Sequence, residues 1–415
     1  MTNILTDYTT EPVELLEFIP TANDSAGVRD HPIPAQYLGR VMVDTVHDGS
    51  FIPAQFLQDS EGGSIGADAF RGYYERERDW GASMVAGFLS SALGLEGFFQ
   101  VNVARVLMDY GRFPGVTGSK AEHLNRYAVN YPFSDLLSYE QKTHLLESYY
   151  DLISARTDAV VRDRLIKIAV HTYDPINPSG IQRPHVSLVN RSNAIQEHGE
   201  LPRGMFDPLY PDVLAEFTAD RILLSRISLT LEKHGVPVAH NYPYCLPEGS
   251  IEVRSQVWFY FNYLRRRFLT QHPETEGLPG YRRVWAMLMD TNLRSTESEA
   301  LRSHLHMFRR APSGRGSEFR AAREAYTHLQ VFVEKNPEIV NDYRFSPDRP
   351  SSLGIEVRKD LVWEFDGLKP IRPRPDNARA IADSIAEAVA MYLREDRTAP
   401  DSVPRRFGYM GGDRR

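Results

Sequence analysis

Six short runs of aliphatic and β-branched residues constrain the fold of this chain more than any other feature of its sequence. Each run is too short for a typical helix, and runs of this kind are typical of strands buried inside a sheet. The runs are RVMVDTVHDG (40–49), VNVARVLMD (101–109), LIKIAVHT (165–172), HVSLVN (185–190), VPVAH (236–240) and LGIEVR (353–358). We therefore predict a strand at each of them.

Longer stretches with apolar residues at helical spacing separate these runs, at about 78–94, 136–163, 212–234 and 376–394. In the third stretch one narrow arc of a helix would hold the apolar residues Val213, Phe217, Leu224, Ile227 and Leu231. A helix that lies on a sheet needs such an apolar face. Strands that alternate with helices predict a layered α/β fold with a largely parallel or mixed central sheet.

The chain is long enough, at 415 residues, for one large domain with insertions or for two domains. We expect a single α/β domain at 39–398. Residues 1–38 carry Pro, Asp and Asn without a clear period and are expected to form an irregular arm. Residues 255–345, rich in Arg, Glu, Tyr and Leu at helical spacing, predict a helical insertion between the last two strands. The Pro-, Gly- and Arg-rich segment 399–415 is expected to be a flexible tail.

Charge and cysteine usage narrow the function. A net charge of -7 argues against a nucleic-acid binder, which would normally carry a basic face. We therefore expect a small-molecule partner. The one cysteine, Cys245, leaves no intrachain disulfide and no thiolate-rich zinc site possible. Any metal must be held by His, Asp or Glu.

The N-terminal sequence MTNILTDYTTEPVELLEF lacks the basic start and the continuous apolar core of a signal peptide. No stretch of ~18 apolar residues occurs anywhere in the chain. We expect a cytoplasmic protein that makes no membrane contact. The oligomeric state stays open.

Three polar residues lie at or inside predicted strands. His47 closes the first strand, His171 closes the third, and Glu356 lies inside the last. Functional groups gather where strands of an α/β sheet end, and two imidazoles with a carboxylate are the usual ingredients of a catalytic zinc site. The alternative for each histidine is a hydrogen-bonded structural residue.

Glu356 is flanked by Ile355 and Val357, and a carboxylate buried without a partner in a core strand is costly. A cation must therefore be near, for which Arg358, Arg112 or a metal are the candidates. A structural ion pair remains the alternative to a catalytic role.

Two loops carry further candidate residues. Arg112, in MDYGRFPG (108–115), is suited to gripping a substrate carboxylate with two hydrogen bonds, or it could cap a helix or pair with Asp109. Asn241, in HNYPY (240–244), could orient a substrate or cap its turn.

These segments, taken in order, resemble the motifs of the N-formylglutamate amidohydrolases. The segments that carry the resemblance are VMVDTVHDGSFIP, RDWGASMVAGF, VARVLMDYGRFPG, IKIAVHTYDP, RPHVSLVNRSNA, NYPY and GIEVRKDL. In that family they correspond to a strand ending in His-Ser-Gly-x-x-Ile-Pro, an Asp-Trp segment, Ser-Arg-x-x-x-Asp-Leu-Asn-Arg, Asp-x-His-Ser, a strand with a Gly-Asp-Arg turn, Asn-x-Pro-Tyr, and Gln-x-Glu-x-Arg-x-Asp-Leu. The matches run from about residue 40 to 365.

The resemblance implies a zinc-dependent enzyme with a three-layer α/β/α fold, like that of zinc carboxypeptidases and of phosphorylase/hydrolase-like proteins, and makes 39–398 its catalytic domain. His47 and His171 would be ligands of Zn²⁺, with Asp79 as the acidic third ligand. Asp48, next to His47, competes for that third position.

The resemblance also implies roles in catalysis and binding. Glu356 would activate a water molecule and then protonate the departing amine. Arg112, with Arg105, would bind a substrate carboxylate or the oxyanion. The further residues expected to contact substrate are Asn241, Tyr244 and Arg358.

The chain departs from the family pattern at two positions. The family's His-Ser-Gly is His-Asp-Gly here, through Asp48, and Gly111 replaces the Asn that precedes the motif's last Arg. Both changes argue against N-formylglutamate itself as the substrate. We therefore expect a zinc-dependent amidohydrolase that cleaves a non-peptide C–N amide bond in a small N-acyl amino acid or related metabolite bearing a carboxylate. The alternatives are a carboxypeptidase-like peptidase of the same fold and a non-catalytic small-molecule-binding protein.

Overall fold

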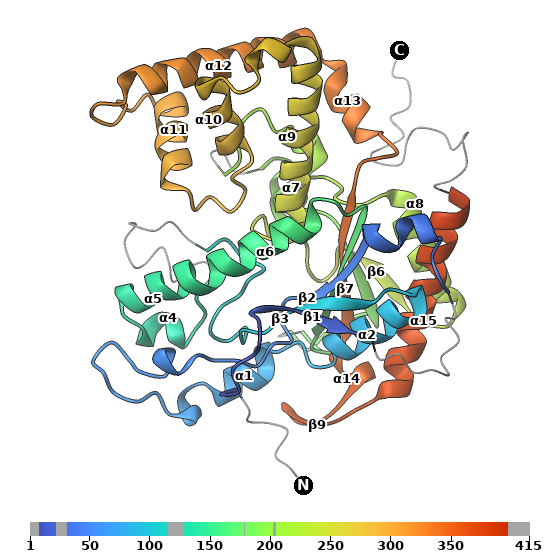
Figure 1. Ribbon diagram of the computed structural model, residues 1–415. Coiled ribbons are helices and arrows are strands. Elements are labelled where there is room, and N and C mark those ends of the chain that lie inside the picture. The colour runs from blue at the N-terminus through green and yellow to red at the C-terminus, as the bar shows by residue number, and fades with distance from the viewer. Residues whose placement is uncertain (1–7, 22–30, 115–127, 178, 202–204, 397–415) are drawn as a thin grey trace.

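The computed structural model describes residues 8–21, 31–114, 128–177, 179–201 and 205–396. In these residues a seven-stranded sheet runs through the molecule in the order β1-β3-β2-β4-β7-β5-β6 (Figure 1). Its strands are β1 (Leu16–Pro20), β2 (Val41–Thr45), β3 (Gly97–Val101), β4 (Ile166–Tyr173), β5 (Val186–Val189), β6 (Val238–His240) and β7 (Ser351–Arg358).

The sheet is mixed and largely parallel. Strands β3, β2, β4 and β7 run parallel to one another, while β1 and β5 pair antiparallel with β3 and β7. β6 runs parallel to β5 at the far edge. Parallel neighbours end at the same edge of a sheet, so the ends of β2, β4 and β7 lie close together.

Helices cover both faces. One face packs against α2 (Ala82–Leu93), α8 (Arg221–Lys233) and α15 (Pro375–Met391) through a core of aliphatic residues. The other face is covered by α6 (Asp151–Val161) and α9 (Ile251–Gln271). This arrangement confirms the predicted three-layer α/β/α class with a mixed, largely parallel sheet.

The stretch between β6 and β7 is helical, and Figure 1 shows its helices gathered at one end of the molecule. They are α9, α10 (Pro279–Leu288), α11 (Thr296–His306), α12 (Gly316–Lys335) and α13 (Glu338–Arg344). Their buried side chains belong to the same apolar cluster as Met42 of β2 and Val101 of β3. The helices of this insertion therefore share a core with the sheet.

Shorter elements complete the described chain. The helices are α1 (Arg71–Glu77), α4 (Phe133–Leu136), α5 (Tyr139–Leu145), α7 (Asn193–His198) and α14 (Lys359–Val362), and a hairpin pairs β8 (Trp363–Asp366) with β9 (Lys369–Pro373). No helix among the described residues has the length and apolar character that a membrane span requires.

Two predictions about residues 1–109 differ from the structure. The strand predicted at 101–109 ends at Val101, and a loop follows in which Leu107 and Met108 donate backbone hydrogen bonds to Ala104. Apolar residues in this loop are buried although they do not belong to the sheet. A buried loop therefore produced the same apolar run in the sequence as a buried strand would. The N-terminal arm is also not irregular throughout, because β1 forms an edge strand on β3.

Three helices have boundaries that differ from the predicted ones. The helix predicted at 136–163 is α5 and α6 joined by a π-type turn at 146–150. The helix predicted at 212–234 begins at Arg221, where the Asp220 carboxylate accepts a hydrogen bond from the Ile222 N–H and so caps the first turn. The helix predicted from 78 begins at Ala82. The predicted tail at 399–415 lies outside the described residues.

Candidate metal centre

His171 and Glu356 lie side by side because of strand register. On β4 the residues Ile166, Ile168 and Val170 face α2, α8 and α15, so His171, one residue further on, points to the opposite face. The parallel pairing of β4 with β7 sets His171 directly opposite Glu356. Alternation and register alone therefore bring an imidazole and a carboxylate together.

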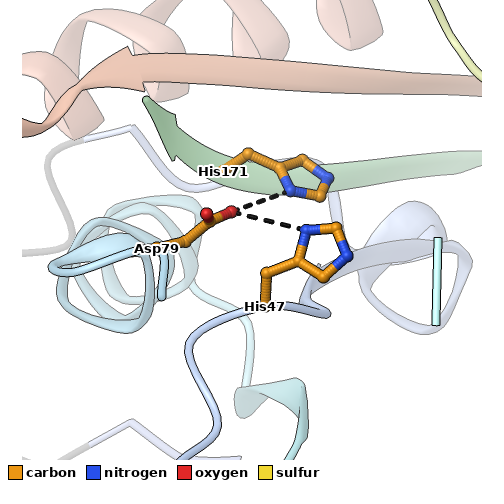
Figure 2. Close-up of side chains that lie close together, drawn as sticks. All are labelled: His47, Asp79 and His171. Atoms are coloured by element: carbon orange, nitrogen blue, oxygen red, sulfur yellow. Dashed lines mark hydrogen bonds and ion pairs between the residues drawn. The ribbon is translucent and has the colours of Figure 1, made fainter. Parts of the chain in front are cut away.

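His47 and Asp79 approach this point from loops. His47 follows the end of β2, and its carbonyl oxygen accepts a hydrogen bond from the Asp79 N–H, which precedes α2. Figure 2 shows both imidazole rings facing the Asp79 carboxylate. His47, Asp79 and His171 are far apart in the sequence. The backbone hydrogen bond between the two loops brings His47 and Asp79 together.

The three side chains converge tightly. Asp79 Oδ2 lies 3.1 Å from Nδ1 of His171 and 3.6 Å from Nδ1 of His47. The possible ligand atoms of this trio all lie within 4.8 Å of one another, and it is the one such group in the described part of the chain. Two ring nitrogens that face one carboxylate oxygen need either a proton each or one cation that all three atoms share. Two imidazole nitrogens and a carboxylate oxygen suit a divalent metal such as zinc.

Electrostatics inside the cluster favour ionised Asp79. Burial by itself would raise the pKa of Asp79, but hydrogen bonds from His171 and His47 and the positive charge of Arg105 hold that pKa well below its ordinary value. Burial likewise opposes protonation of His171, yet its hydrogen bond to Asp79 and the charge of Glu356 raise the pKa of His171 to about 9. The opposite charges of Asp79 and His171 therefore attract each other at the centre of the cluster.

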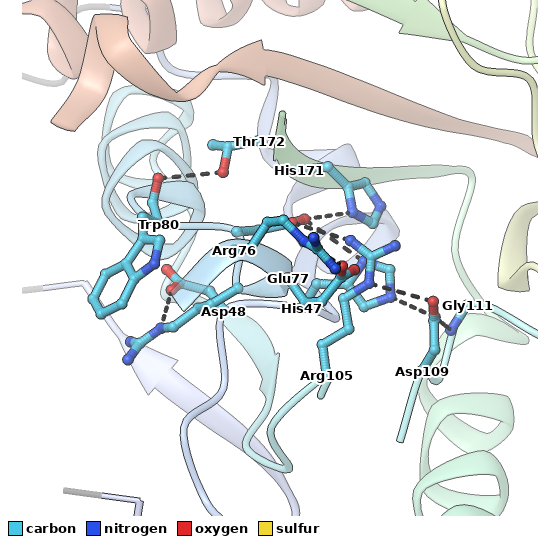
Figure 3. A network of polar contacts seen from close by, with 12 residues as sticks. His47, Asp48, Arg76, Glu77, Trp80, Arg105, Asp109, Gly111, His171 and Thr172 are labelled. Carbon is cyan, nitrogen blue, oxygen red and sulfur yellow. Dashed lines mark hydrogen bonds and ion pairs between the residues drawn. The ribbon is translucent and has the colours of Figure 1, made fainter. Parts of the chain in front are cut away.

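The competing third ligand, Asp48, is engaged elsewhere. Its carboxylate accepts hydrogen bonds from Nε of Arg78 and from the N–H of Ser83, each at 2.9 Å. Figure 3 shows Asp48 directed away from His171. Of the two candidates that the sequence left open, Asp79 is the one that joins the histidines.

The sequence suggested Asp109 only as a partner of Arg112, and its contact with His47 was not predicted. Its Oδ1 lies 2.8 Å from Nε2 of His47 and also accepts a hydrogen bond from the N–H of Gly111 (Figure 3). Burial would raise the pKa of Asp109, but the charges of His47 and Arg105 hold that pKa far below its ordinary value. An ionised carboxylate only accepts, so His47 donates its Nε2–H and turns Nδ1 toward Asp79. Such outer partners orient metal-binding histidines.

Gly111 allows this close approach. A Cβ at this position would lie 3.2 Å from Oδ1 of Asp109 and 3.3 Å from Nε2 of His47. A larger residue would therefore press on the hydrogen bond that orients His47. The departure from the family pattern at Gly111 has a local structural reason.

Neither of the two arginines predicted as partners of Glu356 pairs with it. Arg358 pairs with Asp360 at 2.7 Å, and Arg112 lies 3.2 Å from Asp109. Among the described residues none donates a hydrogen bond to the Glu356 carboxylate. Burial raises the pKa of Glu356, opposed by the positive charge of His171 and reinforced by the negative charge of Asp79.

The predicted binding residues divide into two groups. Arg105, Arg112 and Tyr244 line one pocket of about 600 Å³ together with the metal cluster and Glu356. Asn241 and Arg358 do not line it. The Asn241 carboxamide accepts hydrogen bonds from the N–H groups of Asn190 and Arg191, so it holds the loop that follows β5 rather than capping its own turn.

The two arginines expected to bind substrate are already paired with acids. Arg105 lies 3.4 Å from Asp79 and 3.3 Å from Asp109, and Arg112 contacts the same Asp109 oxygen as Arg105 does. The Arg112 side chain is 49% exposed. The alternative pairing of Arg112 with Asp109 is therefore present in the structure.

A second charged network lies under the pocket and was also missed. The Lys167 ammonium group, on β4, donates to Asp44 at 2.9 Å and to Glu252 at 2.7 Å. Burial opposes ionisation of Glu252, but the charge of Lys167 lowers the pKa of Glu252 to about 2. Glu252 belongs to the first turn of α9 and lines the pocket, so the helical insertion supplies part of its wall. The signal in the sequence was Lys167, a charged residue inside an apolar run.

Comparisons with known proteins are sparse. No protein-family model and no curated protein matches this chain. Among solved structures, N-formylglutamate amidohydrolase from Ralstonia eutropha JMP134 is 12% identical with a TM-score of 0.46, over 91% of this chain and 98% of that one. A gene product from Agrobacterium tumefaciens is 13% identical with a TM-score of 0.41, over 87% of this chain and 96% of that one. Likeness at this level assigns neither a family nor a function.

Proposed function

We propose that this protein is a zinc-dependent amidohydrolase that cleaves the C–N amide bond of a small N-acyl amino acid or a related metabolite. The observation that carries the proposal is one pocket in which three convergent ligand atoms lie beside a half-buried carboxylate. That carboxylate, Glu356, has no hydrogen-bond donor among the described residues, and its register neighbour is the ligand His171.

His47, Asp79 and His171 would hold the metal, and the hydrogen bond from His47 to Asp109 would keep the His47 ring in the required orientation. A zinc ion in such a site supplies Lewis-acid chemistry to water and to an amide carbonyl. Three protein ligands leave a position for reactants, which is typical of catalytic rather than structural zinc sites.

Glu356 would move the proton. As the oxygen of a water molecule forms a bond to the amide carbon, the Glu356 carboxylate takes a proton from that water. As the C–N bond breaks, the same group delivers the proton to the departing nitrogen, so the products are a carboxylic acid and an amine. The burial that raises the pKa of Glu356 suits it to both steps.

The pocket supports a small substrate. Its volume of about 600 Å³ falls within the ~300–1,000 Å³ range of small-molecule sites. Ser250, Ile251 and Glu252, at the start of the helical insertion, form part of its wall. A wall built from the insertion favours a small acylated substrate over a long peptide.

The test is metal content and turnover of protein purified without a histidine tag. We expect stoichiometric zinc, loss of activity on chelation, and hydrolysis of at least one member of a panel of formyl, acetyl and succinyl amides. Glu356→Gln should keep the zinc and lower kcat by about 10²–10⁴-fold, the usual contribution of a general acid–base.

The matched control is Glu334→Gln, an exposed glutamate on α12, which should behave as the parent protein does. Trace zinc with no activation by added metal would contradict the metal assignment. Full activity of Glu356→Gln in zinc-loaded protein would contradict the role of Glu356.

A further inference from the structure

The same pocket contains a cation that the metal cluster does not use, Arg183. Its backbone is held firmly: its N–H donates to the Pro175 carbonyl at 2.8 Å, and its own carbonyl accepts from Nη1 of Arg358 at 3.3 Å. The Tyr173 hydroxyl donates to the carbonyl of the next residue, Pro184. Arg358, predicted to contact substrate, instead supports the segment that carries Arg183.

The guanidinium of Arg183 is poorly compensated. The residue is only 8% exposed, its Nη1 donates to the Asp174 backbone carbonyl at 3.2 Å, and its buried Nε has no hydrogen-bond partner. No carboxylate of the described residues lies within ion-pair distance of it. Arg105 and Arg112 in the same pocket both contact Asp109. A buried charge without an opposite charge is costly, and that cost falls when an anion binds.

Two aromatic rings hold this guanidinium in place. Its carbon lies 5.0 Å from the ring centre of Tyr244 and 5.6 Å from that of Tyr173. The two rings meet edge to face, with their centres 6.3 Å apart, and all three residues line the pocket. Ring contacts of this kind fix a guanidinium and exclude water from it.

We propose that Arg183, flanked by Tyr173 and Tyr244, is the subsite that binds a carboxylate group of the substrate. The inference rests on the proposed function, and it moves the anion-binding role from Arg112 and Arg105 to Arg183. A carboxylate matches a guanidinium in charge and in acceptor geometry. A monoanion also suits the surroundings better than phosphate does, because the pocket already contains the carboxylates of Asp174, Glu252 and Glu356.

The experiment compares ligands that differ only in this charge. N-acetylleucine and N-acetylglutamate are titrated calorimetrically against their C-terminal amides, with inorganic phosphate as a further probe, in zinc-loaded and chelated full-length protein. In the parent protein the acids should bind more tightly than the amides. Arg183→Met should weaken binding of the acids by about 10–100-fold, the range for a hydrogen-bonded charge, and leave the amides unchanged.

Two further variants separate charge from folding. Arg183→Lys keeps the charge without the planar fork and should recover part of the affinity for the acids. Arg379→Met removes an exposed arginine on α15, which packs on the face opposite the pocket, and should change nothing. In steady-state kinetics Arg183→Met should raise KM for acids while kcat changes little.

Three results would overturn the inference: Arg183→Met binds acids as the parent does, it loses acids and amides equally, or the parent prefers phosphate to carboxylates. The proposed function fails separately. Suppose that neither chelated nor zinc-treated protein hydrolyses an amide, but that the parent binds acids selectively and Arg183→Met abolishes this selectivity. The proposed function is then wrong, and the carboxylate subsite is still supported. If amides are hydrolysed with zinc but Arg183→Met has no effect on acids, only the subsite is lost.

Discussion

Two charged groups that line the pocket differ in how their charges are compensated. In the metal cluster Asp79 faces two imidazoles and Arg105, while Asp109 faces His47 and two arginines. In the second group Arg183 donates to a single backbone carbonyl. A compensated network keeps its geometry before any ligand arrives, whereas an uncompensated cation gains most when one does. We therefore expect the metal cluster to be pre-organised and Arg183 to select among substrates.

Glu356 shares a feature with each group. It lies beside the proposed metal ligand His171, as strand register requires, but like Arg183 it has no ion-pair partner among the described residues. A carboxylate in that condition is free to exchange a proton with reactants. The following substitutions test whether the residues with compensated charges hold the metal, while those without an ion-pair partner act on the substrate.

The largest effect is expected from His171→Ala. This removes one of three ligands and leaves the Asp79 carboxylate without its shortest contact. Zinc affinity should fall by more than about 100-fold, and turnover should fall with it. Loss of a residue that only hydrogen-bonds to a metal ligand lowers affinity by up to about 100-fold, so loss of a ligand itself should lower it further. Metal analysis after dialysis measures the change.

His144→Ala is the matched control, because His144 is exposed on α5 and contacts Ser148 and nearby aromatic rings. It should retain zinc. Stoichiometric zinc in His171→Ala would show that the cluster is not the metal site.

An intermediate effect is expected from Asp109→Asn. The amide keeps the size of the side chain but removes the charge that makes His47 donate its Nε2–H. Zinc affinity or kcat/KM should fall by about 10–100-fold, the range for losing an outer partner of a histidine ligand. Competition with a chelating dye measures the affinity.

Asp342→Asn, an exposed aspartate on α13, provides the comparison and should leave zinc affinity unchanged. If Asp109→Asn binds zinc as tightly as the parent protein does, the charged network around Asp109 is structural and does not position the metal ligands.

The smallest effect is expected from Asp48→Asn. Asp48 pairs with Arg78 and accepts from the N–H of Ser83 in the first turn of α2, so its charge stabilises the start of that helix. Stability should fall by about 0.5–2 kcal/mol, as for the loss of a helix cap, while zinc content stays the same. Chemical denaturation followed by circular dichroism gives the first quantity. Loss of zinc here, with zinc retained in Asp79→Asn, would reverse the assignment of the third ligand.

Much of the fold was predictable because strand and helix periods are local properties of the chain. The alternation of apolar runs and amphipathic stretches predicted the layered α/β class, and the run that contains Lys167 and His171 carries its polar residues on one face of β4. The strand prediction at 101–109 was wrong because these apolar residues are buried in a loop and not in the sheet.

The sequence by itself determined that His47, His171 and Glu356 would stand at or inside strands, since a pleated strand dictates which side chains share a face. Only the tertiary structure decided which acids and bases meet. Asp109 reaches His47 across 62 residues, and Asp79 reaches His171 across 92. The contacts of Arg183 with Tyr173 and Tyr244 likewise depend on how the end of β4 and two loops fold together. No period in the chain encodes such contacts, because they arise from three-dimensional packing of loops rather than from the repeat of one element.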